Sequence, residues 1–260
     1  MIEYRFSLEE LEFFLLVLTR TTSFIFIAPF FGMNNTPARV KIGLGFFISL
    51  LLYHTSVPHA ALSYQTVWGY GIIVMKEVMT GLFIGFGAQL CTTVVIFAGM
   101  IIDMNIGLSM VTMLDPTTRE NTSITGMFLQ YTTLLMLLIS GMYEYLLRAF
   151  VDTYRLIPIN GAVFDTDHLI ASMIQFLSEY IIIGFRICLP VFAVIMILDA
   201  VLGILAKVAP QMNMFSVGIQ LKILVGLMTL FLTVAMLPGA TDFIFQEVKV
   251  MVTRITEGLM

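Results

Sequence analysis

Charged residues are scarce in this sequence: Asp, Glu, Lys and Arg make up 12 % of its 260 residues, against roughly 25 % in typical soluble domains. The 13 Lys and Arg residues are outnumbered by 17 Asp and Glu residues, which gives a net charge of −4. No basic stripe is present, so a nucleic-acid-binding protein is excluded. Two cysteines, Cys91 and Cys188, are too few for a disulfide scaffold, and each lies in an apolar run where a thiol packs as a small hydrophobe.

Hydrophobic residues dominate instead, at 59 % of the sequence with a mean hydropathy of +0.97. This composition excludes a disordered chain and suits lipid better than water, so the sequence predicts an integral membrane protein. The start is acidic, with Glu9, Glu10 and Glu12. A cleaved signal peptide has a basic start, so we expect the first apolar segment to remain in the mature protein.

The apolar runs predict an all-α, polytopic protein with about six long, kinked helical segments. The uncharged run 78–102 is long enough to span a membrane, and 121–143 and 223–241 come close. The alternating pattern of a transmembrane barrel is absent. Pro190 lies within the apolar segment 169–206 and predicts a kink there, because proline removes a helical hydrogen bond.

The first helix is predicted from about Leu11 to Phe31, with Arg20 in its middle. We expect a single membrane-embedded domain over 1–260 that ends in an amphipathic tail at 242–260. Irregular backbone is expected between the segments, at 32–39, 54–65, 104–122, 152–168 and 207–213.

Many of the few charges lie inside or at the edges of apolar segments, where each needs a partner or water. They are Arg20, Lys76, Glu77, Asp103, Glu179, Arg186, Asp199, Lys207 and Lys222. Glycines one turn away accompany several of them, as in Gly218, Lys222 and Gly226, and small residues allow a neighbouring helix to approach. Interhelical or intersubunit ion pairing is the favoured interpretation. A proton relay through Asp103, Glu179 or Asp199 is the alternative.

Motifs for enzymatic chemistry are missing. We find no Walker motif, nucleophile elbow or carboxylate pair, and His54, His59 and His168 lack the spacing of metal ligands. The sequence therefore predicts a protein that is not an enzyme and needs no cofactor. The 19 methionines include Met110 and Met113, whose adaptable side chains suit gap filling or a deformable seal.

Three stretches together resemble the FliR/SctT family of type III export-gate proteins. The first runs from Arg20 to Lys41 and includes Pro37-Ala38-Arg39-Val40-Lys41, and the second leads from Gly107-Leu108-Ser109-Met110 to Asp115-Pro116. The third, from Gly184 to Gly226, is the most specific. Its motif residues are Pro190, Pro210, Gln211, Asn213 and Gly218.

The resemblance implies a fold of kinked helical hairpins similar to a fusion of FliP and FliQ. It implies a subunit that assembles with FliP and FliQ, associates with FlhB and FlhA, and helps to pass unfolded flagellar proteins across the bacterial inner membrane at the flagellar basal body. It also implies that the segment at about 104–125 plugs the closed channel. The residues expected to act in gating are Asp103, Met104, Met110, Met113, Asp115, Pro116, Arg119 and Glu120.

We expect the interior charges to make subunit contacts, above all Arg186, Asp199, Lys207 and Lys222. Two other functions stay open, a stand-alone proton-coupled transporter and the SctT subunit of a virulence injectisome. The flagellar branch is favoured because the stretches 37–41 and 115–116 look closer to it.

Overall fold

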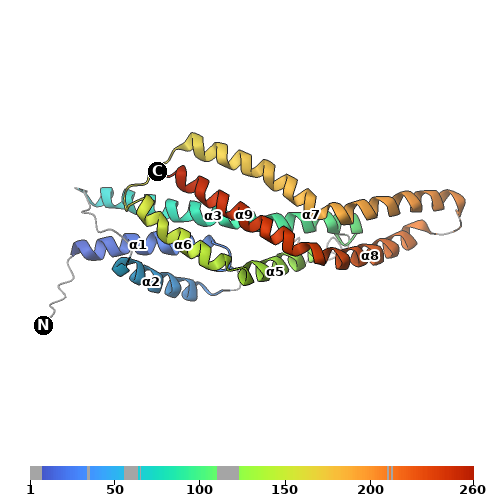
Figure 1. Cartoon of the computed structure of the whole chain (residues 1–260), viewed down its shortest axis with the longest axis horizontal. Helices are drawn as coiled ribbons and strands as arrows, with labels where there is room; N and C mark the ends of the chain where they lie inside the picture. Colours follow the sequence, from blue (N-terminus) through green and yellow to red (C-terminus); the bar gives the residue numbers. More distant parts are fainter. Residues whose placement is uncertain are drawn as a thin grey trace. The chain divides into compact units, whose positions relative to one another are not determined.

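The computed structural model describes residues 8–33, 36–55, 64, 66–109, 123–209, 211 and 213–260, and every regular element in these ranges is a helix (Figure 1). The elements are α1 (Leu8–Ile27), α2 (Ala38–Thr55), α3 (Val67–Ile106), α5 (Ile124–Ile139), α6 (Met142–Leu156), α7 (Thr166–Val208), α8 (Met214–Thr233), the short η1 (Val234–Met236) and α9 (Leu237–Glu257). The prediction of an all-α polytopic protein is confirmed.

Helix boundaries differ from the expected ones by about one turn in places. The first helix begins at Leu8 and ends at Ile27. It does not continue to Phe31 as expected, because Phe30 adopts a left-handed backbone with φ of 69°, which a right-handed helix cannot contain. The range 152–168, expected to be irregular, is helical at both ends, since α6 extends to Leu156 and α7 begins at Thr166. Capping explains the early start of α7: the side chain of Asp165 accepts hydrogen bonds from the first backbone N–H groups of that helix.

The chain divides into two compact units, each built from several segments. Unit 1 comprises residues 1–91, 141–176 and 246–260, and unit 2 comprises 92–140 and 177–245. Unit 1 therefore holds α1, α2 and α6, and unit 2 holds α5 and α8, while α3, α7 and α9 contribute to both.

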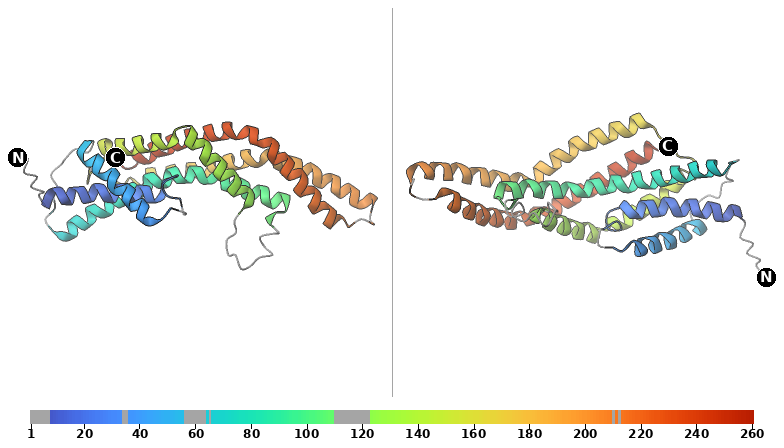
Figure 2. Two further views of the ribbon diagram at one scale, coloured as in Figure 1. Left: turned by 90° about the horizontal axis from the view of Figure 1, so that it is seen from below. Right: turned by 180° about the vertical axis from the view of Figure 1, so that it is seen from behind.

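In unit 1, α1 packs beside α2 and against the first part of α3 (Figure 2). Gly81 and Gly85 of α3 make the second contact close: a methyl group added at Gly81 would lie 2.3 Å from the carbonyl oxygen of Arg20. Such small residues bring helix backbones together. The α6 helix closes this core with Phe150, whose ring stacks on that of Phe24 at 4.2 Å between centroids.

In unit 2, the end of α3 packs on the start of α5, and α7 and α8 form a hairpin (Figure 2). Aromatic residues join α3 to α7, where the ring of Phe97 lies 5.5 Å from that of Tyr180, both measured at the centroids. The hairpin exposes large apolar side chains, among them Ile204 on α7 and Phe231 on α8. This surface is suited to lipid or to other proteins.

Three described ranges are long and apolar enough to cross a membrane: Val67–Ile106, Thr166–Val208 and Ser216–Glu257. Counting α5 and α6 together as one interrupted span would add a fourth. Pro190 lies inside the second of these ranges. Length and composition therefore support a membrane protein.

Candidate functional site

The most deeply buried charges belong to unit 1. Arg20 of α1 and Glu77 of α3 have fully buried side chains, each 0 % exposed, with Nε of the arginine 2.7 Å from Oε2 of the glutamate. Nη1 of Arg20 also donates a hydrogen bond of 2.9 Å to the carbonyl oxygen of Ile157. Oε1 of Glu77 accepts one of 2.9 Å from the backbone N–H of Asn160. Arg20 and Glu77, two of the predicted interior charges, thus have their partners in the same chain.

Tyr154 of α6 completes the surroundings of Arg20. The guanidinium carbon lies 4.7 Å from the centre of the tyrosine ring, a cation–π contact. The tyrosine hydroxyl donates to the carbonyl oxygen of Val17, 3.1 Å away, and lies at the same distance from the hydroxyl of Thr21. Nη2 of Arg20 has no hydrogen-bond partner among the described residues. The short Nε–Oε2 contact is not directed as a hydrogen bond, so the pair is held mainly by charge.

A second buried acid, Asp103, lies in unit 2 near the end of α3 and is 5 % exposed. Its Oδ2 accepts a hydrogen bond of 2.7 Å from the hydroxyl of Ser123 and one of 3.2 Å from the backbone N–H of Thr125. Ser123 is also the N-cap of α5, because its hydroxyl oxygen accepts from the N–H of Gly126. A carboxylate is stabilised there by the free N–H groups of the first helical turn. We call Asp103, Ser123 and Thr125 the loop clamp.

Two glycines bring the helices together at the loop clamp. A methyl group added at Gly99 would lie 2.2 Å from Cα of Gly126, so the backbones of α3 and α5 touch. The clamp and this contact fix both ends of the predicted gate segment. Met104 belongs to the described part and is 70 % exposed. The other predicted gating residues, Met110, Met113, Asp115, Pro116, Arg119 and Glu120, lie outside the described residues.

Ser123 and Thr125 lie inside the predicted gate segment 104–125, but the sequence analysis did not single them out. The signal was a serine directly before an apolar helical run, which is typical of an N-cap. Nothing in the sequence pairs that serine with an aspartate 20 residues earlier.

The α7–α8 hairpin of unit 2 holds another predicted pair. Nζ of Lys222 lies 2.6 Å from Oδ1 of Asp199, and the two side chains are 27 % and 42 % exposed. Among the other predicted charges, Lys207 and Arg186 are exposed, and Lys76 and Glu179 are half-buried.

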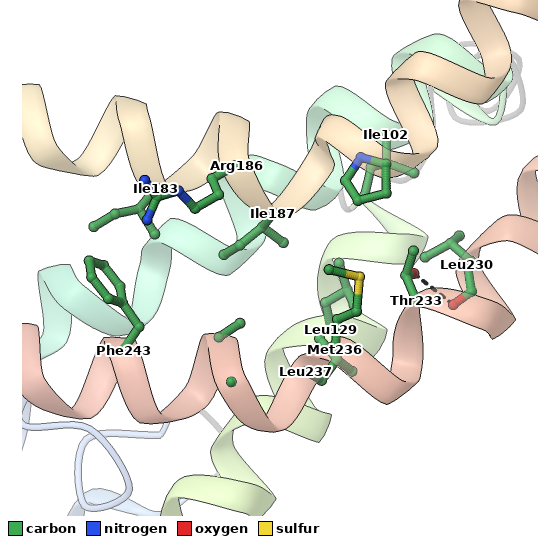
Figure 3. A pocket seen from close by; sticks show the side chains of 13 residues that line it. Ile102, Leu129, Ile183, Arg186, Ile187, Leu230, Thr233, Met236, Leu237 and Phe243 are labelled. Carbon is green, nitrogen blue, oxygen red and sulfur yellow. Dashed lines mark hydrogen bonds between the residues drawn. The ribbon is translucent and has the colours of Figure 1, made fainter.

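Arg186 and Pro190 share a groove within unit 2, with a volume of about 320 Å³ (Figure 3). The remaining lining residues are apolar or small apart from Thr233, and they come from α3, α5, α7, η1 and the helices on either side of it. The part of the chain that the structure describes holds no cluster of three or more His, Cys, Asp or Glu side chains that could bind a metal ion.

Comparison with known proteins gives these features a context. The family described as "Bacterial export proteins, family 1" matches residues 11–248. The flagellar biosynthetic protein FliR of Bacillus subtilis (strain 168) is 30 % identical over 226 residues, 86 % of each chain. The chain belongs to the FliR family. It is also similar to the FliR proteins of Pectobacterium carotovorum subsp. carotovorum and Escherichia coli (strain K12), at 28 % and 26 % identity, over 88 % and 89 % of this chain and 87 % of each relative.

Membership confirms the expected resemblance. FliR-family proteins are components of a flagellar export apparatus and not enzymes. In such a component the functional features are the gate segment and the surfaces that meet other molecules.

The FliR motif residues around the α7–α8 turn have identifiable local positions. Asn213 is the N-cap of α8, and its side-chain oxygen accepts a hydrogen bond of 3.4 Å from the N–H of Ser216. Gln211 is an exposed turn residue, and Gly218 lies within α8. Pro210 lies outside the described residues. The motif thus includes the cap that begins the second helix of the hairpin.

Proposed function

We propose that this FliR-family chain is a channel-forming subunit of the flagellar type III protein export gate. In this proposal it assembles with FliP and FliQ in the bacterial inner membrane at the flagellar basal body, in association with FlhB and FlhA. It passes unfolded flagellar proteins across the membrane, and other components supply the driving force. The segment at about 104–125 closes the channel between export events.

The loop clamp is the observation that carries the gating part of the proposal. A plug must leave the channel path and return to it, so its ends need a fixed anchor. Asp103 joins the last turn of α3 to the first turn of α5 through Ser123 and Thr125. The contact between Gly99 and Gly126 holds the backbones of α3 and α5 close together at the same junction. Functional loops are generally held by a rigid scaffold in this way.

The apolar surface of the α7–α8 hairpin supports assembly. Contiguous exposed apolar residues on a protein mark contact with lipid or with other subunits. Lys207, Lys222 and Asp199 lie on the same hairpin and are at least partly exposed. A partner helix that packs here would meet charges able to pair with its own, and we assign these residues to subunit contacts.

Shortening residues 106–122 in the assembled gate tests the plug. We expect ions or small molecules to leak through the purified complex in planar bilayers, while co-purification of the subunits is unchanged. Replacing the same residues with a Gly-Ser linker of equal length separates loss of side chains from loss of length. A conductance equal to that of the unaltered complex would refute the plug assignment.

A matched pair of point variants tests the loop clamp itself. Ser123→Ala removes the cap and one partner of Asp103, and we expect a smaller leak than after shortening, together with a loss of about 1 kcal/mol from the α5 cap. Ser140→Ala at the other end of α5 is the control, because the Ser140 hydroxyl donates within its own helix, to the carbonyl oxygen of Leu137. Equal leak from the two variants would remove the clamp from the gating mechanism.

The transporter alternative is less well supported by the geometry. All three candidate proton carriers have interactions: Asp103 is held in the loop clamp, Asp199 pairs with Lys222, and Glu179 also has an interaction within the chain. Reconstituting the chain alone in liposomes under a pH gradient separates the two functions. Uptake of a substrate by the single chain would contradict the export-gate proposal.

Co-purification followed by mass measurement identifies the partners. Recovery of FliP and FliQ supports a flagellar gate, whereas recovery of injectisome homologues would assign the chain to the SctT branch.

A further inference from the structure

The groove in unit 2 is lined almost entirely by apolar side chains. Ile183, Ile187 and Pro190 contribute from α7, and Leu237 and Phe243 from α9. Its volume of about 320 Å³ lies at the lower end of the range of roughly 300–1,000 Å³ for small-molecule sites. The space therefore suits a flexible apolar chain.

One cation lines this groove. Arg186 is exposed, and no described residue forms a hydrogen bond or ion pair with it. In Figure 3 its side chain extends along α7 beside Ile183, and Phe243 projects from α9 toward the same end of the groove. The hydroxyl of Thr233, the other polar side chain of the lining, is occupied by the carbonyl oxygen of Leu230. The guanidinium is thus the polar group available to a ligand.

The position of Arg186 in its helix allows it to lie at a membrane surface. The α7 helix has 43 residues, about twice the roughly 20 needed to cross a bilayer. Arg186 lies near the middle of this length, where an uncharged run begins at Ile187 and continues to Leu198. An arginine next to such a run avoids the bilayer centre by facing the interface or a counter-ion.

A ligand that carries an anion and an apolar chain satisfies both parts of the site. Guanidinium groups bind phosphate through paired hydrogen bonds, and basic pockets between membrane helices bind anionic lipid headgroups. A helix is about 10–12 Å across with its side chains, so a space of about 320 Å³ cannot hold one. We propose that this groove binds an anionic phospholipid, with its phosphate at Arg186 and an acyl chain along the apolar lining.

Photolabelling of the full chain in vesicles of phosphatidylcholine tests the site, with photoactivatable phosphatidylglycerol or phosphatidylcholine as probe. We expect phosphatidylglycerol to label the α7 and α9 peptides in preference. Arg186→Gln should lower this preference by roughly fivefold, the factor for one cation near an anionic lipid. Arg155→Gln is the matched control, because Arg155 is an exposed arginine in unit 1.

A second variant blocks the groove and keeps its charge. A methyl group added at Gly239, a lining residue, would meet no atom within 4 Å, so Gly239→Leu fills the groove without a clash at Cβ. It should abolish labelling by both lipids at this site. Gly203→Leu is the control, because Gly203 is equally open and does not line the groove.

Two results would overturn the lipid site: an unchanged preference in Arg186→Gln, or full labelling of Gly239→Leu. If neither lipid labels the groove and the Arg186→Gln variant no longer co-purifies with partner subunits, the groove would instead be assigned to an acidic side chain of another protein. That result would leave the export-gate proposal intact.

Discussion

Two ion pairs of nearly equal length occupy opposite environments in this molecule. Arg20 and Glu77 in unit 1 are 2.7 Å apart and fully buried, whereas Lys222 and Asp199 in unit 2 are 2.6 Å apart and partly exposed. Removing one member of a buried pair leaves the other charge buried without a partner, which strongly destabilises the fold. An exposed pair contributes little to the folding free energy. Burial, and not distance, therefore separates a pair that holds the fold from one available to another molecule.

The glycines near each pair differ in the same way. Gly81 and Gly85 follow Glu77 at steps of four, and their faces are filled by backbone atoms of α1. Beside the second pair, a methyl group at Gly203 would meet nothing within 4 Å, and one at Gly218 would make only an ordinary contact with Leu202, whereas one at Gly226 would lie 2.6 Å from side-chain atoms of Ile106. The glycines after Glu77 therefore lie against the α1 segment of their own chain, and among the glycines near the second pair open space is found at Gly203.

The largest effect is expected from Glu77→Gln. The change preserves shape but leaves the Arg20 charge buried without its counter-ion, which costs about 3–5 kcal/mol of folding free energy. Thermal unfolding of the purified chain in detergent measures it. Glu144→Gln is the matched control, because Glu144 pairs with Arg148 on an exposed face, and we expect a change within about 0.5 kcal/mol.

A rescue separates charge from packing at the buried pair. The double variant Arg20→Met with Glu77→Leu removes both charges, and it should recover much of the stability lost in Glu77→Gln. If Glu77→Gln unfolds at the same temperature as Glu144→Gln, the distinction between the two pairs fails.

A smaller effect is expected from the glycine contrast. Gly81→Ala would place a methyl group 2.1 Å from the hydroxyl oxygen of Ser23 and 2.3 Å from the Arg20 carbonyl oxygen. Because the second atom is backbone, α1 must shift, at a cost of about 1–3 kcal/mol. Gly203→Ala should be neutral or stabilising by about 0.5–1 kcal/mol, because alanine favours a helix and the site is open. Equal unfolding temperatures for the two variants would contradict the close α1–α3 contact.

Much of the fold could be predicted from the sequence, because long apolar runs indicate helices in a lipid environment and the interruptions of these runs indicate where the helices end. The helical class and the burial of Arg20 and Glu77 follow from such runs. The pairing of Arg20 with Glu77 does not, nor do the contacts with Ile157 and Asn160, which are 137 and 83 residues from their partners. These depend on how α6 and the turn after it return to α1, a tertiary arrangement with no local signal.

The loop clamp shows the same limit at shorter range. A capping serine before α5 is a local pattern, but its acceptor Asp103 lies 20 residues earlier in the sequence, on another helix. Arg186 could be singled out in the sequence as a charge within an apolar segment. That no described residue pairs with it depends on which helices surround the groove, and no local pattern predicts this.

The smallest effect on stability is expected from Lys222→Met, which also tests the partner-facing half of the comparison. The pair is partly exposed, so the unfolding free energy of the isolated chain should fall by about 1 kcal/mol or less, and high salt should reduce that difference. In the proposed assembly a partner covers this site, so Asp199 would be left buried and unpaired, and co-purification with partner subunits should weaken more clearly. Arg148→Met, on an exposed face of unit 1, is the control. Unaltered complex yield would remove the pair from assembly. A loss well above about 1 kcal/mol in the isolated chain would instead make the pair structural, because a partly exposed lysine can cost that much only if it already holds its own hairpin together.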